Sequence, residues 1–176
     1  MRSCLIRPST SQDLTAMAGI YAHAVLGGTG SFEIEPPQPE ELALRRDAVL
    51  AQGLPWLVAQ TEAGVQGFAY ATRFRPRPAY RFSVEDSVYV DPAAQGRGLG
   101  RLLLAELVSL CAARGARQML AVIGDSDNLA SIHLHRRLGF EPSGQFSQVG
   151  YKFGRWLDIV LMQRSLGPGA QTLPHD

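Results

Sequence analysis

Apolar residues along this chain follow two spacings, and each spacing predicts one kind of element. Apolar residues that alternate or run together between Gly, Pro or polar residues are typical of strands, whereas apolar residues three and four apart are typical of helices. Strands are predicted at residues 4–7, 55–61, 65–72, 81–90, 118–123, 140–149 and 156–163. Helices are predicted between a capping-box pattern at 10–13 and the glycines at 27–28, and at 40–51, 99–114 and 128–137.

The order of these elements predicts an α/β fold. Two strands joined by a short turn at 62–64 come before a strand, a helix and a further strand, so antiparallel pairs should lie beside a parallel connection. We therefore expect a mixed, mostly antiparallel seven-stranded sheet with helices on both faces. Residues 1–166 should form a single domain, followed by a loose C-terminal tail at 167–176. The proline-rich segment 29–39 is expected to be a loop that covers or lines a pocket.

Composition narrows the class of protein. The 176 residues are 45% hydrophobic and 19% charged, which excludes a disordered chain, and the net charge of +1 argues against a general nucleic-acid or anionic-membrane binder. The two cysteines, Cys4 and Cys111, lack metal-ligand spacing, so we expect neither a disulfide framework nor a metal site. We find no signal-peptide pattern and no apolar run near 18 residues, and we expect a cytoplasmic protein.

A glycine-rich turn between an apolar strand and a leucine-rich helix is the sharpest local feature. It spans residues 95–101 and has glycines at 96, 98 and 100. Glycines let main-chain amides approach a ligand closely, and a helix start adds unpaired N–H groups and the positive end of its dipole. The turn is therefore expected to hold an anion such as a phosphate. Its spacing fits neither a dinucleotide fingerprint nor a P-loop, and a turn without a ligand is the alternative.

This turn, as Gln95-x-x-Gly98-x-Gly100, resembles the acetyl-CoA pyrophosphate loop of the GNAT superfamily of N-acetyltransferases. Residues 128–140, in which an asparagine opens a helix that ends in Leu-Gly-Phe, are similar to the second signature of that superfamily. The resemblance implies a GNAT fold and transfer of an acetyl group from acetyl-CoA to a primary amine, in a ternary complex without an acyl-enzyme. More narrowly, phosphinothricin and methionine-sulfoximine acetyltransferases are similar to this chain at 31–33, 74–77, 84–90, 121–125 and 150–158.

Glu85 resembles the family glutamate assigned as the general base, acting through water. An amine must lose a proton before it attacks a thioester, and a carboxylate can accept that proton. The alternative is a strand-edge carboxylate paired with a nearby arginine. Asp86 follows directly but should face the other side of the strand, because side chains alternate along it, and we assign it no role.

His135 occupies the position at which many members carry the tyrosine that protonates the leaving thiolate, and at which the phosphinothricin subgroup has histidine. An imidazole can donate or accept a proton near neutral pH, so either His135 or Glu85 could be the base. The alternative is a hydrogen-bonded histidine that stabilises the end of its helix. His133 should point to a different helix face, which argues against a metal site formed by these two histidines.

The resemblance also implies a set of residues that bind acetyl-CoA. Asn128 should either bond the pantetheine arm or cap its helix, and Val88 and Val90 should offer main-chain groups to the pantetheine amides. The expected cofactor-binding residues are Val88, Val90, Gln95, Gly96, Arg97, Gly98, Gly100, Arg101, Asn128 and Ser131.

Four arginines at 73, 75, 77 and 81 suggest a site for the carboxylate of an amino-acid-like acceptor. If extended, the first three share one face, and a guanidinium can bind a carboxylate through two parallel hydrogen bonds. We favour Arg75 for this role, and Lys152, the only lysine, could reach the same anion. A solvated hairpin and a contact to a second subunit are the alternatives. The expected substrate-binding residues are Phe32, Arg73, Arg75, Tyr80 and Lys152.

These features together predict an enzyme that acetylates the α-amino group of a small amino-acid analogue such as methionine sulfoximine, methionine sulfone or phosphinothricin. One alternative acceptor is a protein N-terminus or a polyamine, although the basic segment 73–81 argues against a polyamine. Another alternative is a non-catalytic acyl-CoA sensor, which would not need an acid-base pair. The enzyme should bind neither nucleic acid nor a membrane, and exposed apolar strand ends together with the resemblance imply a homodimer.

Overall fold

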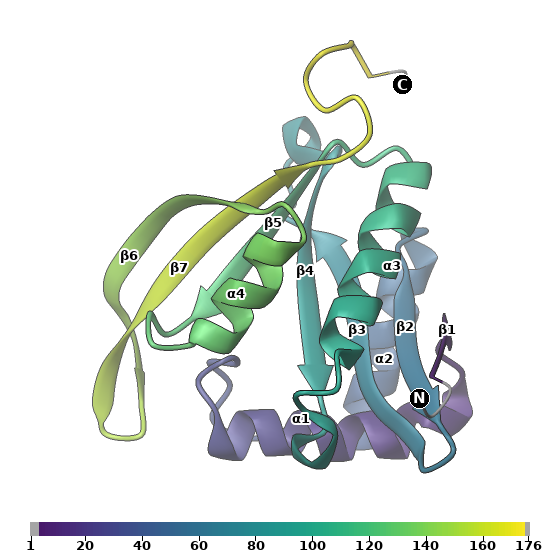
Figure 1. Ribbon diagram of the computed structural model, residues 1–176, viewed down its shortest axis with the longest axis vertical. Coiled ribbons are helices and arrows are strands. Elements are labelled where there is room, and N and C mark those ends of the chain that lie inside the picture. The colour runs from purple at the N-terminus through teal and green to yellow at the C-terminus, as the bar shows by residue number, and fades with distance from the viewer. Residues whose placement is uncertain (1–3, 175–176) are drawn as a thin grey trace.

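The computed structural model describes residues 4–174, which form one seven-stranded sheet and four α-helices (Figure 1). The strands are β1 (Leu5–Pro8), β2 (Trp56–Thr61), β3 (Gly64–Arg73), β4 (Ser83–Val90), β5 (Gln118–Gly124), β6 (Glu141–Lys152) and β7 (Arg155–Ser165). The helices are α1 (Leu14–Gly27), α2 (Pro39–Ala51), α3 (Leu99–Ala113) and α4 (Leu129–Arg137). The strand order is β1-β2-β3-β4-β5-β7-β6, and β4 and β5 run parallel while the other neighbours run antiparallel. The predicted mixed α/β sheet is confirmed.

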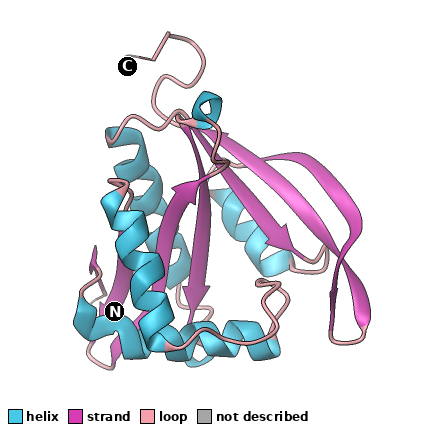
Figure 2. Cartoon of the chain, turned by 180° about the vertical axis from the view of Figure 1, so that it is seen from behind, coloured by secondary structure: helices cyan, strands magenta, loops and turns pink. Residues whose placement is uncertain are grey.

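Helices cover both faces of the sheet, with α3 and α4 on one face and α1 and α2 on the other (Figure 2). Strand β2 shows how the sequence produces this arrangement. Leu57 and Ala59 pack in the core beneath α3, whereas Trp56 and Val58 pack against α1 and α2. Because successive side chains point to opposite faces, a strand that is covered on both sides is apolar at every position.

Several element boundaries differ from the prediction by one to three residues, and for β4 and β6 the reasons are local. β4 begins at Ser83 instead of Arg81, because a 3₁₀ turn at Pro78–Tyr80 precedes it. β6 continues to Lys152, past two register shifts, and a tight turn with positive φ at residues 153 and 154 joins it to β7. The ends of these strands are therefore set by turns and irregular pairing that the apolar pattern does not show.

The described part of the C-terminal tail, residues 167–174, contains neither helix nor strand. Arg117 fastens it to the domain, since its guanidinium donates to the main-chain oxygens of Gly169 and Leu173 and to the hydroxyl of Thr172. Residues 1–3 of the predicted domain and residues 175–176 of the predicted tail lie outside the described residues. Within residues 4–174, every helix is too short or too polar to cross a bilayer.

Candidate active site

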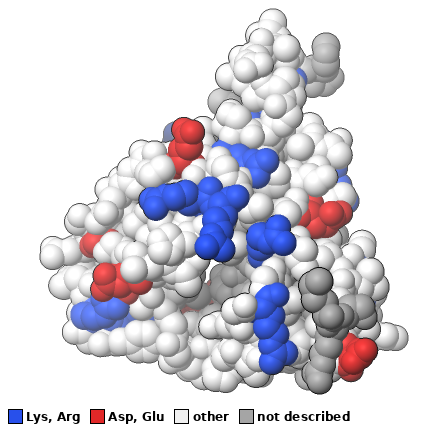
Figure 3. Space-filling view, in the orientation of Figure 1, with Lys and Arg blue, Asp and Glu red and all other residues white. Residues whose placement is uncertain are grey.

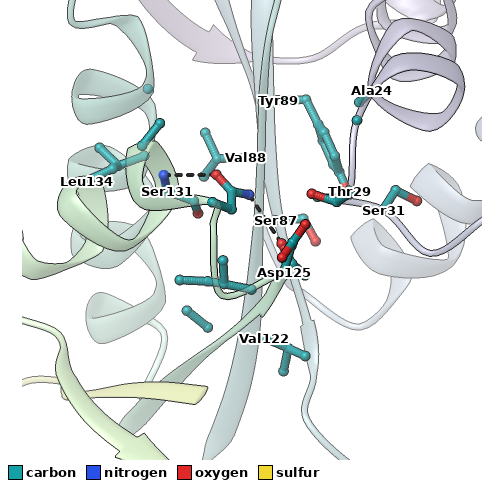
Figure 4. Close-up of a pocket in the computed structure, with 18 of the residues that line it drawn as sticks. Ala24, Thr29, Ser31, Ser87, Val88, Tyr89, Val122, Asp125, Ser131 and Leu134 are labelled. Carbon is teal, nitrogen blue, oxygen red and sulfur yellow. Dashed lines mark hydrogen bonds between the residues drawn. The ribbon is translucent and has the colours of Figure 1, made fainter. Parts of the chain in front are cut away.

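β4 and β5 separate after a short stretch of pairing, and a cavity of about 780 Å³ opens where they part. The parallel pairing joins residues 83–85 to residues 118–120. Beyond these residues, main-chain groups of β4 face the cavity instead of a neighbouring strand, which suits them to a ligand with amide groups. Figure 4 shows Ser131 and Leu134 of α4 on one side of the cavity, and Ala24, Thr29 and Ser31 on the other.

The glycine-rich turn lies at one end of this cavity, where β4 leads into α3. Gly96 and Gly98 have φ angles of 74° and 80°, which residues with a side chain rarely adopt. Gly98 is the N-cap of α3 and has no side chain to cap it, so the first amides of the helix remain available to an anion. The local backbone therefore fits the predicted phosphate-binding role.

Positive charge surrounds this end of the cavity at the surface. Arg97 and Arg101 lie on the turn and the first turn of α3, Arg136 and Arg137 lie at the end of α4, and all four are exposed. Figure 3 shows basic side chains gathered around a hollow on this face, while acidic side chains lie mostly farther out. This distribution favours a ligand that carries phosphates.

Most of the residues predicted to bind the cofactor lie together at the cavity. Asn128 caps α4, because its Oδ1 accepts a 3.2 Å hydrogen bond from the Ser131 amide. Its Nδ2 also donates to the main-chain oxygen of Gly124 at 3.4 Å, so the structure shows the capping role. The predicted residues that line the cavity are Val88, Val90, Gln95, Gly100, Asn128 and Ser131. Those that lie outside its lining, exposed on the turn and the start of α3, are Gly96, Arg97, Gly98 and Arg101.

Glu85 lines the cavity at the point where β4 and β5 separate. Its neighbour Val84 packs beneath α3, so the Glu85 side chain points to the face covered by α1. Burial, followed by the negative charge of Asp86, raises the pKa of the Glu85 carboxyl, whereas Arg75 opposes this effect. A carboxylate with a raised pKa is a better proton acceptor near neutral pH.

His135 lies in α4 beside the cavity, and only 4% of the residue is exposed. Its Nε2 is 2.9 Å from Oδ2 of Asp86, and its Nδ1 is 2.7 Å from the main-chain oxygen of Ser131. Burial lowers the pKa of His135. The hydrogen bond to Asp86, the charge of Asp86 and the hydrogen bond to the Ser131 oxygen raise it, and together they outweigh burial, so the pKa of His135 is raised. No group of three His, Cys, Asp or Glu within residues 4–174 could hold a metal ion.

Asp86 also lines the cavity, although the sequence pattern predicts no role for it. The predicted alternation is correct, since Glu85 and Asp86 lie on opposite faces of β4. The face of Asp86, however, is the one covered by α3 and α4, and there it meets His135. The sequence carries one signal for this role: Asp86 is a carboxylate on a face of the strand where its neighbours two residues away, Val84 and Val88, are apolar.

Phe32 forms part of the cavity wall. Its ring lies so close to Gly124 and Gly150 that a Cβ atom at either glycine would overlap it. Close approach of a ring to two backbones explains why both positions lack a side chain. Residues 29–33 of the predicted loop line the cavity, and the loop ends where α2 begins at Pro39.

Lys152 holds the loop that carries Phe32 through two hydrogen bonds. Its ammonium donates to the main-chain oxygens of Gly28 at 2.9 Å and Ser31 at 2.7 Å, and the residue is 4% exposed. Desolvation lowers its pKa. Both hydrogen bonds direct the ammonium toward the loop, and Lys152 is not part of the cavity lining.

The arginine-rich segment does not form the extended face considered above. β3 ends at Arg73, and the prolines that follow favour the turn at Pro78–Tyr80. The guanidinium of Arg75 lies over the ring of Phe74, 5.0 Å from its centroid, yet its charge acts on Glu85. The predicted substrate-binding residues outside the cavity lining are Arg73, Arg75, Tyr80 and Lys152.

Comparison with known proteins agrees with this geometry. A family profile described as "Acetyltransferase (GNAT) family" matches residues 21–140. Phosphinothricin N-acetyltransferase of Alcaligenes faecalis is 50% identical over 173 residues, which cover 98% of this chain and 88% of that protein. An L-methionine sulfoximine/L-methionine sulfone acetyltransferase of Pseudomonas paraeruginosa is 47% identical, with 94% of this chain and 96% of the relative covered.

A solved structure shows the same architecture with its ligand. The GNAT phosphinothricin acetyltransferase from Sinorhizobium meliloti, in complex with AcCoA, superposes with a TM-score of 0.95 at 47% identity. The match covers 98% of this chain and 94% of that structure. With a profile match over most of the domain and relatives this similar along most of their length, the chain belongs to the GNAT family of acetyltransferases.

Proposed function

We propose that this enzyme transfers the acetyl group of acetyl-CoA to the α-amino group of a small amino-acid analogue of the phosphinothricin or methionine sulfoximine type. The observation that carries this proposal is one continuous cavity whose lining includes Gly100, Glu85, His135 and Phe32. One end of the cavity suits phosphates, the middle suits proton transfer, and the far wall suits a small acceptor. The names of the relatives support the acceptor class.

Acetyl-CoA would lie along the separated edge of β4. The amides of the glycine turn and the start of α3 would hold the diphosphate, with Arg97 and Arg101 adding charge at the surface. The main chain of Val88 and Val90 would bond the pantetheine amides. The glycine turn and the start of α3 fit the diphosphate because no side chain of Gly98, the N-cap, occupies the first amides of the helix. Bound acetyl-CoA would supply the acetyl group as a thioester.

Glu85 would take the proton from the acceptor ammonium, directly or through water. The free amine would then attack the thioester carbon within the ternary complex, so that the C–N bond forms, the C–S bond breaks and the sulfur leaves as a thiolate. The nitrogen would release its second proton to water as the neutral amide forms. The thiolate needs a proton, and His135 is a second titratable group in the lining of the same cavity as Glu85. His135 would supply that proton or exchange the role of base with Glu85.

The acceptor would lie between Glu85 and the wall formed by Phe32. Arg75 is exposed and its charge acts on Glu85, so a guanidinium is available near the mouth of the cavity for the acceptor carboxylate. A bidentate contact of this kind would orient the α-amino group toward the base.

We also propose that the enzyme is a homodimer in the cytoplasm. The β6–β7 hairpin exposes a set of large apolar side chains, and such patches are typical of protein interfaces. Sedimentation of the wild type and of Trp156→Lys tests this proposal, since a dimer through this hairpin should dissociate in the variant. Members of the patch are Phe146, Val149, Tyr151, Phe153 and Trp156, each more than half exposed.

Thiol release from acetyl-CoA across a panel of amines tests the activity. The panel contains methionine sulfoximine, methionine sulfone, phosphinothricin, a short peptide with a free N-terminus, and spermidine. Release with the amino-acid analogues is expected, and no release above background with any of them would eliminate this acceptor class. Release with the peptide alone would instead indicate N-terminal acetylation.

The double variant Glu85→Ala, His135→Ala separates an enzyme from a sensor. An enzyme should lose turnover while calorimetry still detects acetyl-CoA binding. A wild type that binds acetyl-CoA and acetylates no amine would favour the non-catalytic sensor.

A further inference from the structure

Asp86 and His135 form a buried pair beside the cavity. The contact between Nε2 of His135 and Oδ2 of Asp86 is 2.9 Å, and the two side chains are 5% and 2% exposed. They come from α4 and β4, 49 residues apart, so the tertiary fold creates the contact. The second oxygen, Oδ1 of Asp86, is buried and has no hydrogen-bond partner among residues 4–174.

The hydrogen bonds of His135 fix where its protons lie. A main-chain oxygen can only accept, so Nδ1, 2.7 Å from the Ser131 oxygen, carries a proton. The short contact to Asp86 requires one more proton between Nε2 and Oδ2. With the carboxylate ionised, this proton lies on Nε2, and the pair is an imidazolium and a carboxylate with no net charge. Since Oδ1 is unpartnered, His135 is the group that compensates the charge of Asp86.

Few other titratable groups act on the His135 ring from the elements packed around it. Glu85 lies on the opposite face of β4, and the charge of Asp86 acts on Cys111 of α3. Burial raises the pKa of Cys111 to about 12, so it is an uncharged thiol at neutral pH. The ring of Phe140 stands edge-on to the imidazole, with 5.0 Å between centroids. Other titratable or charged residues at the end of α4 are exposed, namely His133, Arg136 and Arg137.

We propose that Asp86 is a positioning residue for the acetyl transfer: it fixes the ring of His135 beside the cavity and keeps the second proton of that ring in place. This inference rests on the proposed function, because Nδ1 of the protonated ring would pass its proton to the leaving sulfur through the hydroxyl of Ser131, which is 3.3 Å from Nδ1 and lines the cavity. Burial alone would favour the neutral imidazole, so the proton depends on the carboxylate. A neutral side chain at position 86 would let the ring lose that proton near neutral pH.

Asp86→Asn tests the proposal, because it keeps the shape of the side chain and removes its charge. In the full-length protein, the pKa of His135 measured from its imidazole NMR signals should fall by about one unit or more. Loss of a signal in His135→Gln assigns it, and exposed His133 provides an internal reference. The value of kcat at pH 8 should then fall about tenfold and recover as the pH is lowered.

The acid limb of the pH profile provides a second check. The negative charge of Asp86 also raises the pKa of Glu85, after burial, so this limb should move to lower pH in Asp86→Asn. The recovery of kcat is therefore measured above that limb. Asp47→Asn, at an exposed residue of α2 outside the cavity lining, is the matched control and should keep the wild-type profile.

A His135 titration that does not move in Asp86→Asn would overturn the proposal. So would a titration that moves while the pH profile of kcat stays unchanged, since the pair would then be structural only. If Asp86→Asn does not fold, Asp86→Ser is measured in the same way. If the wild type acetylates no amine, the proposed function fails, whereas the NMR arm still tests whether Asp86 holds the proton of His135.

Discussion

Glu85 and Asp86 are neighbours in the chain, yet their carboxyl groups lie on opposite faces of β4. Asp86 accepts a hydrogen bond from His135 and is buried, whereas Glu85 faces the cavity from the side of α1. Through its negative charge, Asp86 adds to the effect of burial and raises the pKa of Glu85. Two adjacent carboxylates thereby acquire different chemical properties.

Replacement of Glu85 by Gln should remove the base. General-base catalysis contributes about 10²–10⁴-fold, so kcat should fall by a factor in this range. The base must be ionised, so wild-type kcat/KM should fall as the pH decreases through the raised pKa of Glu85, and this limb should disappear in Glu85→Gln. Thiol-release kinetics from pH 4 to 9 measure both effects. Exposed Glu106→Gln on α3 is the control, and activity within twofold of wild type in Glu85→Gln would contradict the assignment.

Gly98→Ala should weaken acetyl-CoA binding. An alanine at φ 80° costs about 1–2 kcal/mol, and a turn that relaxes from this conformation withdraws the amides from the diphosphate. The dissociation constant for acetyl-CoA should rise roughly 5- to 30-fold by calorimetry. Gly19→Ala, inside α1 with open space around its Cβ position, should leave this constant unchanged. An unaltered constant in Gly98→Ala would argue against a phosphate contact at the turn.

Gly150→Ala should impair the acceptor side alone. The added methyl group would overlap the ring of Phe32, so the wall must move. Displacement of a substrate wall lowers kcat/KM for the acceptor by about ten- to a hundredfold, while the dissociation constant for acetyl-CoA should stay the same. Gly27→Ala, with no atom near its Cβ position, is the control. Equal losses for both substrates would show general damage to the fold.

Asp13 should contribute pH-dependent stability. The Arg7 guanidinium binds both of its carboxylate oxygens at 2.7 Å, and this hydrogen bonding lowers the pKa of Asp13 to about 2. A native pKa below the unfolded value stabilises the protein above about pH 4 and is lost as the pH falls toward 2. The contribution at pH 7 is about 2 kcal/mol.

Urea denaturation of Asp13→Asn checks this expectation. The variant should be less stable than the wild type at pH 7, and the difference should shrink below pH 4. Asp47→Asn, whose side chain is 69% exposed, should show little effect at either pH. A difference that is the same at pH 7 and pH 3 would rule out the ion pair as its cause.

The fold was more predictable than the site because its determinants are local. The strand at 118–124 and the helix at 99–113 follow from apolar spacing within each segment. The partners of Lys152, in contrast, lie 121 and 124 residues away, and the fold brings them together. The same holds for Asp86, whose face was predicted while the helix covering that face was not. The resemblance to GNAT enzymes identified Glu85 and His135 as candidates, but it did not reveal the hydrogen bond between Asp86 and His135 or the charges that act on Glu85.

The burial of Lys152 has a practical consequence for handling the protein. Lys152 is the only lysine in the sequence, and its amine lies under the wall of the cavity. No lysine side chain is therefore accessible to amine-reactive dyes or cross-linkers, or to spontaneous acylation by a thioester in solution. Basicity at the surface comes from guanidinium groups, which do not form stable acyl products under these conditions.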